Sequence, residues 1–385
     1  MRLFISSIAL FLAFSLSALS FAQDDNRYFP TPAKHLIIID HDSGEILFEK
    51  NARVPMAPAS MTKIMTASVV FDRLKSGTLS LTDEFEVSEN AWRRGGAKSG
   101  SSTMFLDLNS KASVSDLLRG VIVQSGNDAC IVLAEAIAGS ESNFAKMMND
   151  KAEELGLTTA NFKNSTGWPD DEHVISAYDL AILSSHTINE HPELYKIYAE
   201  RSFKWNGITQ PNRNPLFGAR SHGADGLKTG HTEISKYGFV GSAVRDGKRR
   251  IFVVNGLESK AQRRLESIRI MNAAFNAFNS YGLFKSGDKV GSADVYMGVE
   301  ATVPLIVKSD VSVGLHKAQR SDLKVSVQYK GPVAAPVAEG DEIAKLVISA
   351  EGMEDRRVPL YAGASVARKS FFGRFIAGIL QKIRG

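Results

Sequence analysis

The spacing of apolar residues changes near residue 280, and this change favours a two-part architecture. Before it, segments with helical spacing, such as 60–74 and 117–138, alternate with β-rich segments around turn signals such as Asp246-Gly247. After it, short alternating strands are separated by turns that contain Gly, Asp and Pro. Because one core rarely serves 385 residues, we predict an α+β domain with an antiparallel sheet over residues 30–282, and a small all-β sandwich over residues 283–366.

Several elements of the first part can be assigned individually. Residues 35–40 and 45–49 predict a β-hairpin, and Ser176 is a suitable N-cap for a helix over residues 177–187. Residues 208–222 are rich in Asn, Pro, Gly and Arg and lack periodicity, so we predict a loop near a functional site.

Composition argues against several classes of protein. The chain is 44% hydrophobic and 23% charged, as in globular proteins, and its net charge of +4 is too small and too dispersed to indicate nucleic-acid binding. Cys130 is the only cysteine and lies in an apolar helical run, so we predict a buried core residue. The eight histidines show no His-Glu-x-x-His pattern, and the sequence predicts neither a metal centre nor another cofactor.

The first 22 residues predict a secretory signal peptide. Arg2 supplies the positive end, residues 3–19 are almost wholly apolar, and Ser20-Phe-Ala22 offers small residues before a cut at Gln23. An N-terminal membrane anchor is the alternative, but the apolar core is short. We therefore expect an exported protein.

Residues 368–385 predict an amphipathic helix on a membrane surface. The segment is basic, no acidic residue follows Asp355, and it is too short and too charged to span ~30 Å of hydrocarbon. A helix docked on the protein's own core is the alternative. Its large apolar residues follow one helical face: Phe371, Phe372, Phe375, Ile376, Ile379, Leu380 and Ile383.

The spacing of Ser60 and Lys63 indicates nucleophilic catalysis. On a helix, side chains three residues apart share a face, with Cβ atoms ~5–6 Å apart, so the amine can take the serine proton. Ser60 also follows Pro58-Ala59, which places it at the start of its helix, where backbone N–H groups are unsatisfied and the dipole is positive.

The same Ser-x-x-Lys spacing occurs twice more, in less suitable contexts. Ser321 and Lys324 lie in a predicted strand, where residues three apart point to opposite faces. Ser286 and Lys289 lie in a predicted turn. Neither pair is expected to be aligned.

Two further motifs complete a possible constellation, although neither is specific alone. Ser125-Gly-Asn127 offers a hydroxyl and an amide, but taken alone it is more simply a helix cap. Lys228-Thr-Gly230 precedes a predicted β-hairpin, and Gly230 leaves room for a peptide to pair with an exposed strand edge. A lysine beside serine must lose its charge to act as a base, through burial or through a second cation such as Lys228.

This set of motifs, in this order, resembles the penicillin-binding acyl-serine superfamily, and most closely the low-molecular-mass serine D-alanyl-D-alanine carboxypeptidases of peptidase family S11. The resemblance covers about residues 33–385 and implies a β-lactamase-like acyl-serine transferase domain, a β domain and a terminal anchor. The motifs that carry it are Pro58-Ala-Ser-Met-Thr-Lys-Ile-Met-Thr66, Gly100-Ser-Ser-Thr-Met-Phe105, Gln124-Ser-Gly-Asn-Asp-Ala-Cys130, Trp205-Asn-Gly-Ile-Thr-Gln210 and Asp225-Gly-Leu-Lys-Thr-Gly-His-Thr232.

The resemblance implies a role for each motif residue. Ser60 is the expected nucleophile, Lys63 the general base and Ser125 a proton relay, while Asn127 positions the substrate. Binding of the substrate is assigned to the third motif: Lys228 and Thr229, followed by Gly230 and His231.

Two further predictions concern the groups that bind negatively charged oxygen atoms of the substrate. The resemblance implies an oxyanion hole made by the backbone N–H groups of Ser60 and His231. Arg213, in the polar segment before Lys228, is our own candidate for a second carboxylate contact, and a solvated loop cation is the alternative.

The implied function is removal of the terminal D-alanine from peptidoglycan stem peptides that end in D-Ala-D-Ala, through an acyl-enzyme on Ser60. β-Lactam antibiotics are expected to acylate the same serine. The implied location is the periplasm, with peripheral attachment to the outer face of the cytoplasmic membrane.

D,D-endopeptidase activity on cross-links, which differs in substrate and not in chemistry, remains open, and so do two alternatives of other classes. A β-lactamase would need a residue that activates water for deacylation, and Glu193 in His191-Pro-Glu-Leu-Tyr195 only partly matches the Glu-x-x-Leu-Asn pattern of such enzymes. We therefore predict Glu193 to be a surface residue. A peptidoglycan-binding scaffold without catalysis is the second alternative, and the presence of all the catalytic side chains argues against it.

Overall fold

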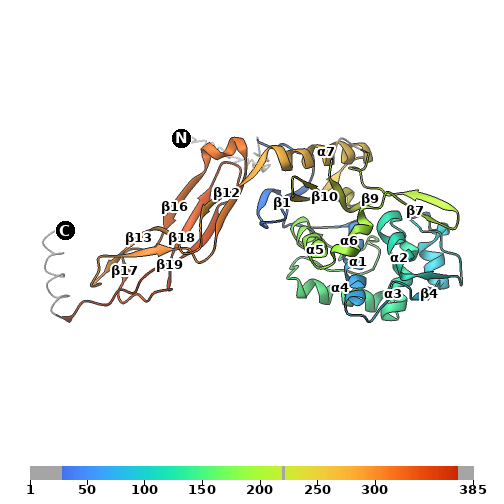
Figure 1. Ribbon diagram of the computed structural model, residues 1–385, viewed down its shortest axis with the longest axis horizontal. Coiled ribbons are helices and arrows are strands. Elements are labelled where there is room, and N and C mark those ends of the chain that lie inside the picture. The colour runs from blue at the N-terminus through green and yellow to red at the C-terminus, as the bar shows by residue number, and fades with distance from the viewer. Residues whose placement is uncertain (1–27, 219–221, 372–385) are drawn as a thin grey trace, which may run out of the picture.

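The structure, a computed structural model, describes residues 28–218 and 222–371 (Figure 1). The predicted signal peptide at 1–22 and nearly all of the predicted amphipathic helix at 368–385 lie outside these ranges. Within the described ranges, no helix is both long enough and apolar enough to cross a membrane. The chain forms a larger part of helices and sheets, and a β part that extends away from it (Figure 1).

An antiparallel sheet lies at the centre of the larger part. Its five strands follow the order β2, β1, β11, β10, β9, which places β9 at an edge. The strands are β1 (His35–Asp40), β2 (Ile46–Lys50), β9 (Ala224–Thr232), β10 (Lys236–Arg245) and β11 (Lys248–Leu257). All neighbours are antiparallel, which confirms the predicted sheet type and the hairpin of residues 35–49.

Both faces of this sheet are buried, because alternate residues along a strand point to opposite sides. In β1, Ile37 and Ile39 join the main apolar core with residues of α1 to α6, whereas Leu36 and Ile38 join a second core with residues of α7. The helices are α1 (Lys63–Lys75), α2 (Val114–Arg119), α3 (Asn127–Ala138), α4 (Glu141–Glu154), α5 (Ala177–Glu190), α6 (Pro192–Tyr195) and α7 (Lys260–Asn276).

Three short antiparallel strand pairs lie outside this sheet. They are β3 (Pro55–Met56) with β6 (Ile175–Ser176), β4 (Glu84–Glu86) with β5 (Lys111–Ser113), and β7 (Ser202–Trp205) with β8 (Ile208–Pro211). The predicted loop at 208–222 is therefore wrong at its start, since residues 208–211 pair as a strand. The predicted N-cap is confirmed: Ser176 Oγ accepts a hydrogen bond from the Asp179 N–H at the start of α5.

The predicted continuous helix over 117–138 is also wrong. The chain leaves α2, makes a π-helical turn over Gly120–Gln124, and then breaks at Ser125, whose φ is 63°. A serine in this left-handed conformation cannot continue a right-handed helix, so α3 begins anew at Asn127. Apolar periodicity runs through the whole segment because both pieces face the same core, and this conceals the break.

The β part is a two-sheet sandwich, as predicted. Strands β16, β18, β19, β14, β13 and β17 form one sheet in this order, and β12 pairs with β15. The strands are β12 (Phe278–Phe284), β13 (Lys289–Tyr296), β14 (Thr302–Ile306), β15 (Val311–His316), β16 (Lys324–Gln328), β17 (Val333–Ala334), β18 (Glu342–Ser349) and β19 (Arg356–Ala362). Their inward residues share one core, for example Val313 with Leu346 and Leu360.

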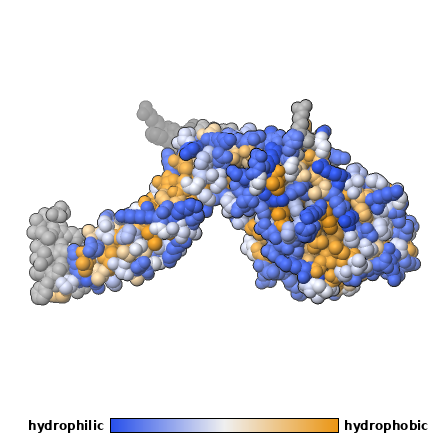
Figure 2. All heavy atoms as spheres, in the orientation of Figure 1, coloured by the Kyte–Doolittle hydropathy of each residue, from blue (hydrophilic) through white to orange (hydrophobic). Residues whose placement is uncertain are grey.

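The two parts are in contact at the start of β12, and the predicted division at 282/283 lies inside that strand. Phe278 packs edge-to-face against Phe29 at 5.5 Å between ring centroids. A Cβ atom on Gly314 would lie 2.1 Å from the Ile46 carbonyl oxygen, so β15 approaches β2 closely. On the face shown in Figure 2, hydrophilic residues predominate, with hydrophobic patches on both parts, as is usual for folded proteins.

Candidate active site

Ser60 and Lys63 lie side by side where the first long helix begins. Ser60 is in a 3-10 turn over Ala59–Thr62, and Lys63 is the first residue of α1, so the helix begins later than predicted. The turn still aligns the two side chains, with 3.1 Å between Lys63 Nζ and Ser60 Oγ. The predicted proximity of hydroxyl and amine is present in the structure.

Lys63 is held by two further acceptors in a dry environment. Its Nζ lies 2.7 Å from Asn127 Oδ1 and 2.6 Å from the Thr166 carbonyl oxygen. The residue is only 1% exposed, and burial lowers the pKa of Lys63 to about 8. At pH 7 this makes about a tenth of the amines neutral, against roughly one in 3,000 for an ordinary lysine.

Asn127 links the second motif to this pair. Its amide is fixed at both ends, because Oδ1 faces Lys63 while Nδ2 donates to Ser101 Oγ at 2.9 Å. Ser125 is 1% exposed, and its Oγ has no hydrogen-bond partner among the described residues. A buried hydroxyl of this kind costs free energy unless a ligand or water completes its bonding. The Ser125-Gly-Asn127 segment therefore forms the break before α3, and its Asn127 side chain contacts Lys63.

Lys228 and Thr229 lie within the edge strand β9, with the hairpin to β10 after them. Both are nearly buried, at 3% and 6% exposed. Burial, and then the positive charges of Lys63 and Arg213, hold the pKa of Lys228 well below its usual range. The sequence offered two causes for the activation of Lys63, burial and a second cation such as Lys228. In the structure burial is the main cause, and the cation that lowers the pKa of Lys63 is Arg213.

Gly230 is required by packing, a reason that the sequence did not indicate. A Cβ atom there would lie 2.7 Å from the Pro58 carbonyl oxygen and 3.3 Å from Ala59 Cβ. The glycine thus lets β9 pack against the turn that carries Ser60. His231 follows on the same strand, and its ring stacks on Tyr237 with 3.9 Å between centroids.

Two arginines flank β9, and the sequence indicated one of them. Arg213 donates from Nη1 to Ser102 Oγ at 2.6 Å, next to Ser101, and its charge lowers the pKa of Lys63 and Lys228, so it lies near both lysines. Arg263, on α7, was missed: its Nη1 donates to the Gly230 carbonyl at 3.1 Å. Burial lowers the pKa of Arg263 to about 10. Its position in a polar helical run gave no signal, because the contact forms only when α7 packs on the sheet.

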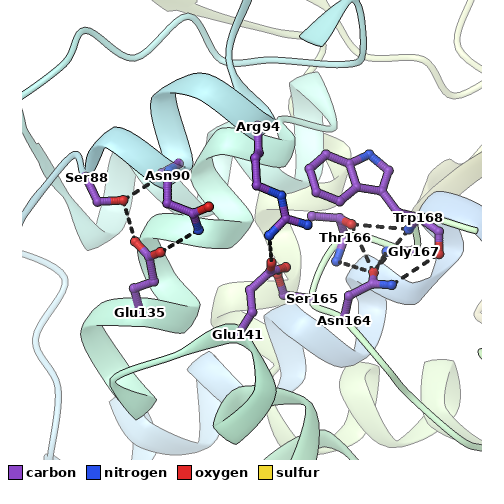
Figure 3. A network of polar contacts seen from close by, with 11 residues as sticks. Ser88, Asn90, Arg94, Glu135, Glu141, Asn164, Ser165, Thr166, Gly167 and Trp168 are labelled. Carbon is purple, nitrogen blue, oxygen red and sulfur yellow. Dashed lines mark hydrogen bonds and ion pairs between the residues drawn. The ribbon is translucent and has the colours of Figure 1, made fainter. Parts of the chain in front are cut away.

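The segment that supplies the Thr166 carbonyl was missed as well. Asn164 Oδ1 accepts the backbone N–H groups of Gly167 at 2.8 Å and Trp168 at 3.1 Å, which closes a tight turn (Figure 3). Gly167 has a φ of +84°, and a Cβ atom there would lie 1.9 Å from the Ala59 carbonyl oxygen. This turn contributes a main-chain carbonyl, so no side chain in the sequence indicates its role.

The structure also shows where the residues lie that we did not assign to the active site. Cys130 is fully buried, as predicted, and burial raises the pKa of its thiol to about 12. Glu193 is on the surface, as predicted: its side chain is 81% exposed and pairs with Lys196 at 2.6 Å. Ser321 lies in a 3-10 turn and not in the predicted strand.

One cluster in the described part of the chain has the donor set of a metal site, but it is already neutralised. Ligand atoms of Asp72, His186 and His191 lie within 4.8 Å of one another. The Lys151 ammonium lies among them, 2.5 Å from Asp72 Oδ2 and 3.3 Å from His186 Nε2. Because this buried cation already pairs with the carboxylate, the residues do not fit a divalent metal.

The fold and the site together define a class. A serine and a desolvated lysine on one helical turn, beside a Ser-x-Asn break and a Lys-Thr-Gly edge strand, are the arrangement of the penicillin-binding serine enzymes. Residues 23–259 match the family model described as D-alanyl-D-alanine carboxypeptidase, and residues 278–368 match that of the penicillin-binding protein 5 C-terminal domain. The chain belongs to the D-alanyl-D-alanine carboxypeptidase family.

Individual relatives agree with this placement. The chain is 35% identical over 388 residues to the D-alanyl-D-alanine carboxypeptidase DacA of Haemophilus influenzae, which covers 99% of this chain and 97% of the relative. It is 36% identical to DacC of Escherichia coli, over 96% of this chain and 93% of the relative. Penicillin-binding protein 5 from Haemophilus influenzae is similar in structure, with a TM-score of 0.67, 37% identity and coverage of 88% of this chain and 99% of that one.

Proposed function

We propose that this protein removes the terminal D-alanine from peptidoglycan stem peptides through an acyl-enzyme on Ser60. The observation that carries the proposal is the 3.1 Å contact between Ser60 Oγ and a buried lysine amine whose pKa is lowered to about 8. An unshifted lysine would be almost wholly protonated at neutral pH and could not accept a proton.

The reaction begins with proton transfer. Lys63 takes the Ser60 proton as Oγ attacks the carbonyl carbon of the penultimate D-alanine. The C–N bond then breaks, the proton passes to the leaving amine with the Ser125 hydroxyl as relay, and free D-alanine departs. Water hydrolyses the resulting ester, with Lys63 as base again, and Ser60 is restored. The backbone N–H groups of Ser60 and His231 stabilise the negative oxygen in both steps.

The edge strand β9 provides the binding surface for the peptide. An extended peptide can add to this edge by main-chain hydrogen bonds. Its C-terminal carboxylate is then held by Lys228 and Thr229, with Arg213 as a further cation. A pocket of about 210 Å³ borders Ala59 and Gly167 and reaches Thr232, beyond His231, and it gives room for the preceding part of the peptide.

Penicillin tests this proposal and both of its alternatives. We expect benzylpenicillin to leave one long-lived penicilloyl group on Ser60, found by intact mass measurement and peptide mapping. The adduct is expected to persist because Glu193, the residue that could most resemble a deacylating base, is on the surface and paired with Lys196. Rapid multiple turnover of penicillin would support a β-lactamase instead, and an unmodified Ser60 would support a scaffold.

We further propose export to the periplasm and attachment to the cytoplasmic membrane through the C-terminal segment. The proposal rests on the signal-peptide pattern of residues 1–22 and on the apolar face and basic charge of residues 368–385. Deletion of residues 370–385 is expected to move the protein from the membrane pellet to the soluble periplasmic fraction, measured by fractionation and immunoblotting. The control is penicillin labelling of the truncated protein, which should stay at the full-length level. Retention of the labelled, truncated protein in the pellet would contradict the proposed attachment.

A further inference from the structure

The contacts of Lys63 define the direction of its lone pair. An ammonium has three N–H donors, and the three acceptors around Nζ satisfy all of them. After loss of one proton, two N–H groups remain. The two shorter contacts, to Asn127 Oδ1 at 2.7 Å and to the Thr166 carbonyl at 2.6 Å, can keep these groups. The lone pair is then directed at Ser60 Oγ, as a base requires.

The Thr166 carbonyl must therefore be held as firmly as the lysine. Asn164 closes the turn that contains it, and Thr66 Oγ1 on α1 donates to the neighbouring Ser165 carbonyl at 2.6 Å. The Asn164 bonds close the turn internally, and the Thr66 bond ties it to α1. A turn fixed to one helix alone can rotate, so a second support from another helix would hold it more firmly.

Glu141 provides this second support. It is the first residue of α4, and one carboxylate oxygen accepts the Ser165 hydroxyl at 2.9 Å while the other pairs with Arg94 at 3.3 Å (Figure 3). The Arg94 guanidinium in turn lies over the Trp168 ring, 5.1 Å from its centroid. The carboxylate thus ties the first half of the turn to α4, and through Arg94 it braces the second half.

We propose that Glu141 is a positioning residue for acyl transfer, which fixes the Asn164–Trp168 turn so that the Thr166 carbonyl orients the Lys63 amine toward Ser60. This inference rests on the proposed roles of Ser60 and Lys63. The proposed effect is on the geometry of the site, because Glu141 is connected to Lys63 only through Ser165 and Thr166.

The negative charge of Glu141 also changes the pKa of Lys63. This electrostatic effect can be measured separately from the positioning effect. Around Lys63, the positive charge of Arg213 lowers the lysine pKa, while the negative charges of Asp128 and Glu141 raise it. Removing only the charge of Glu141 therefore lowers this pKa further. The fraction of neutral amine then increases at a given pH, and the rise of the acylation rate with pH moves to lower pH.

The test measures the rate of penicillin acylation of full-length protein against pH for three variants, together with kcat and KM on an acyl-D-Ala-D-Ala peptide. Glu141→Ala removes the contacts with both Ser165 and Arg94 and is expected to lower the pH-independent maximum by about 10- to 100-fold, mainly in kcat. Glu141→Gln keeps an acceptor for Ser165, so it is expected to stay within about threefold of the wild-type maximum, with its midpoint at lower pH.

The matched control is Glu135→Ala. Glu135, on α3, accepts hydrogen bonds from Ser88 at 2.6 Å and Asn90 at 2.7 Å, and so braces the segment before Arg94 without reaching the turn (Figure 3). This variant is expected to lower the melting temperature without lowering the maximal rate. Equal rates in Glu141→Ala and wild type, equal losses in Glu135→Ala and Glu141→Ala, or equal losses in the Gln and Ala variants of Glu141 would each overturn the inference. Absence of wild-type acylation on Ser60 would instead overturn the proposed function.

Discussion

Replacement of Ser60 by alanine is expected to stop D-alanine release from an acyl-D-Ala-D-Ala peptide, with a loss of about 10⁴- to 10⁶-fold, as for nucleophile removal in other serine enzymes. The loss is large because no covalent intermediate can form without Oγ. The remaining groups can still bind the peptide, so KM is expected to change less than kcat. Released D-alanine is measured with a coupled D-amino-acid oxidase assay, and adduct formation by mass spectrometry.

A serine on the adjoining helix α1 gives the control for this change. Ser68 is fully buried in α1, and its Oγ has no hydrogen-bond partner among the described residues. Ser68 is more buried than Ser60, which is half-buried, so Ser68→Ala is a stringent control for the loss of a hydroxyl, and near wild-type activity is expected. If Ser60→Ala retained D-alanine release above one-tenth of the wild-type rate, the acyl-enzyme on Ser60 would have to be abandoned.

Replacement of Lys63 by methionine is expected to lower the rate of acylation by about 10²- to 10⁴-fold, the usual contribution of a general base. Methionine keeps much of the side-chain volume in this buried position, whereas the proton acceptor is lost. A slow penicillin adduct on Ser60 should still be detectable after long incubation, because the nucleophile and the oxyanion hole remain.

The pKa of Lys63 predicts how the acylation rate depends on pH. Burial lowers the pKa of Lys63 to about 8, and only the neutral amine can accept the serine proton. The wild-type acylation rate is therefore expected to rise with pH through a midpoint near 8, and the Lys63→Met variant is expected to lose this rise. Stopped-flow or quench measurements of penicillin acylation between pH 6 and 10 provide the comparison.

Lys151 offers a matched lysine outside the site. Its side chain is 6% exposed, and its ammonium pairs with Asp72 at 2.5 Å. Lys151→Met breaks this pair and leaves a partly buried carboxylate without its cation, so a lower melting temperature is expected. Acylation should nevertheless keep its wild-type midpoint and maximum. If Lys63→Met acylated as fast as Lys151→Met, another group would have to be the base.

Local patterns in the sequence were sufficient for much of the fold. The alternation in residues 35–49 and 236–256 predicted strands that the structure contains, and the change of pattern near residue 280 predicted the β sandwich. These patterns are reliable because each strand or helix must present apolar residues to a core at its own period. The same reasoning gave a wrong prediction for residues 117–138. The chain breaks at Ser125, but the residues on both sides of the break face one core, so the apolar period continues.

The residues of the candidate site could be predicted from the sequence where their side chains carry the chemistry. Ser60 and Lys63 could be paired because helical spacing fixes their distance, whatever the rest of the chain does. Arg263, Glu141 and the Thr166 carbonyl could not be found in this way. They reach the site from α7, α4 and the Asn164–Trp168 turn, and their positions depend on how these elements pack.

The sequence by itself determined the two-part architecture and the serine–lysine pair, because both follow from periodicities of a few residues that no distant contact needs to establish. Only the tertiary structure decided why the lysine is a usable base. Its pKa is lowered mainly by burial under segments far away in the chain, and its amine is oriented by Asn127 and Thr166, which are 64 and 103 residues away. Desolvation and orientation are properties of the packed interior, so they arise when the chain folds.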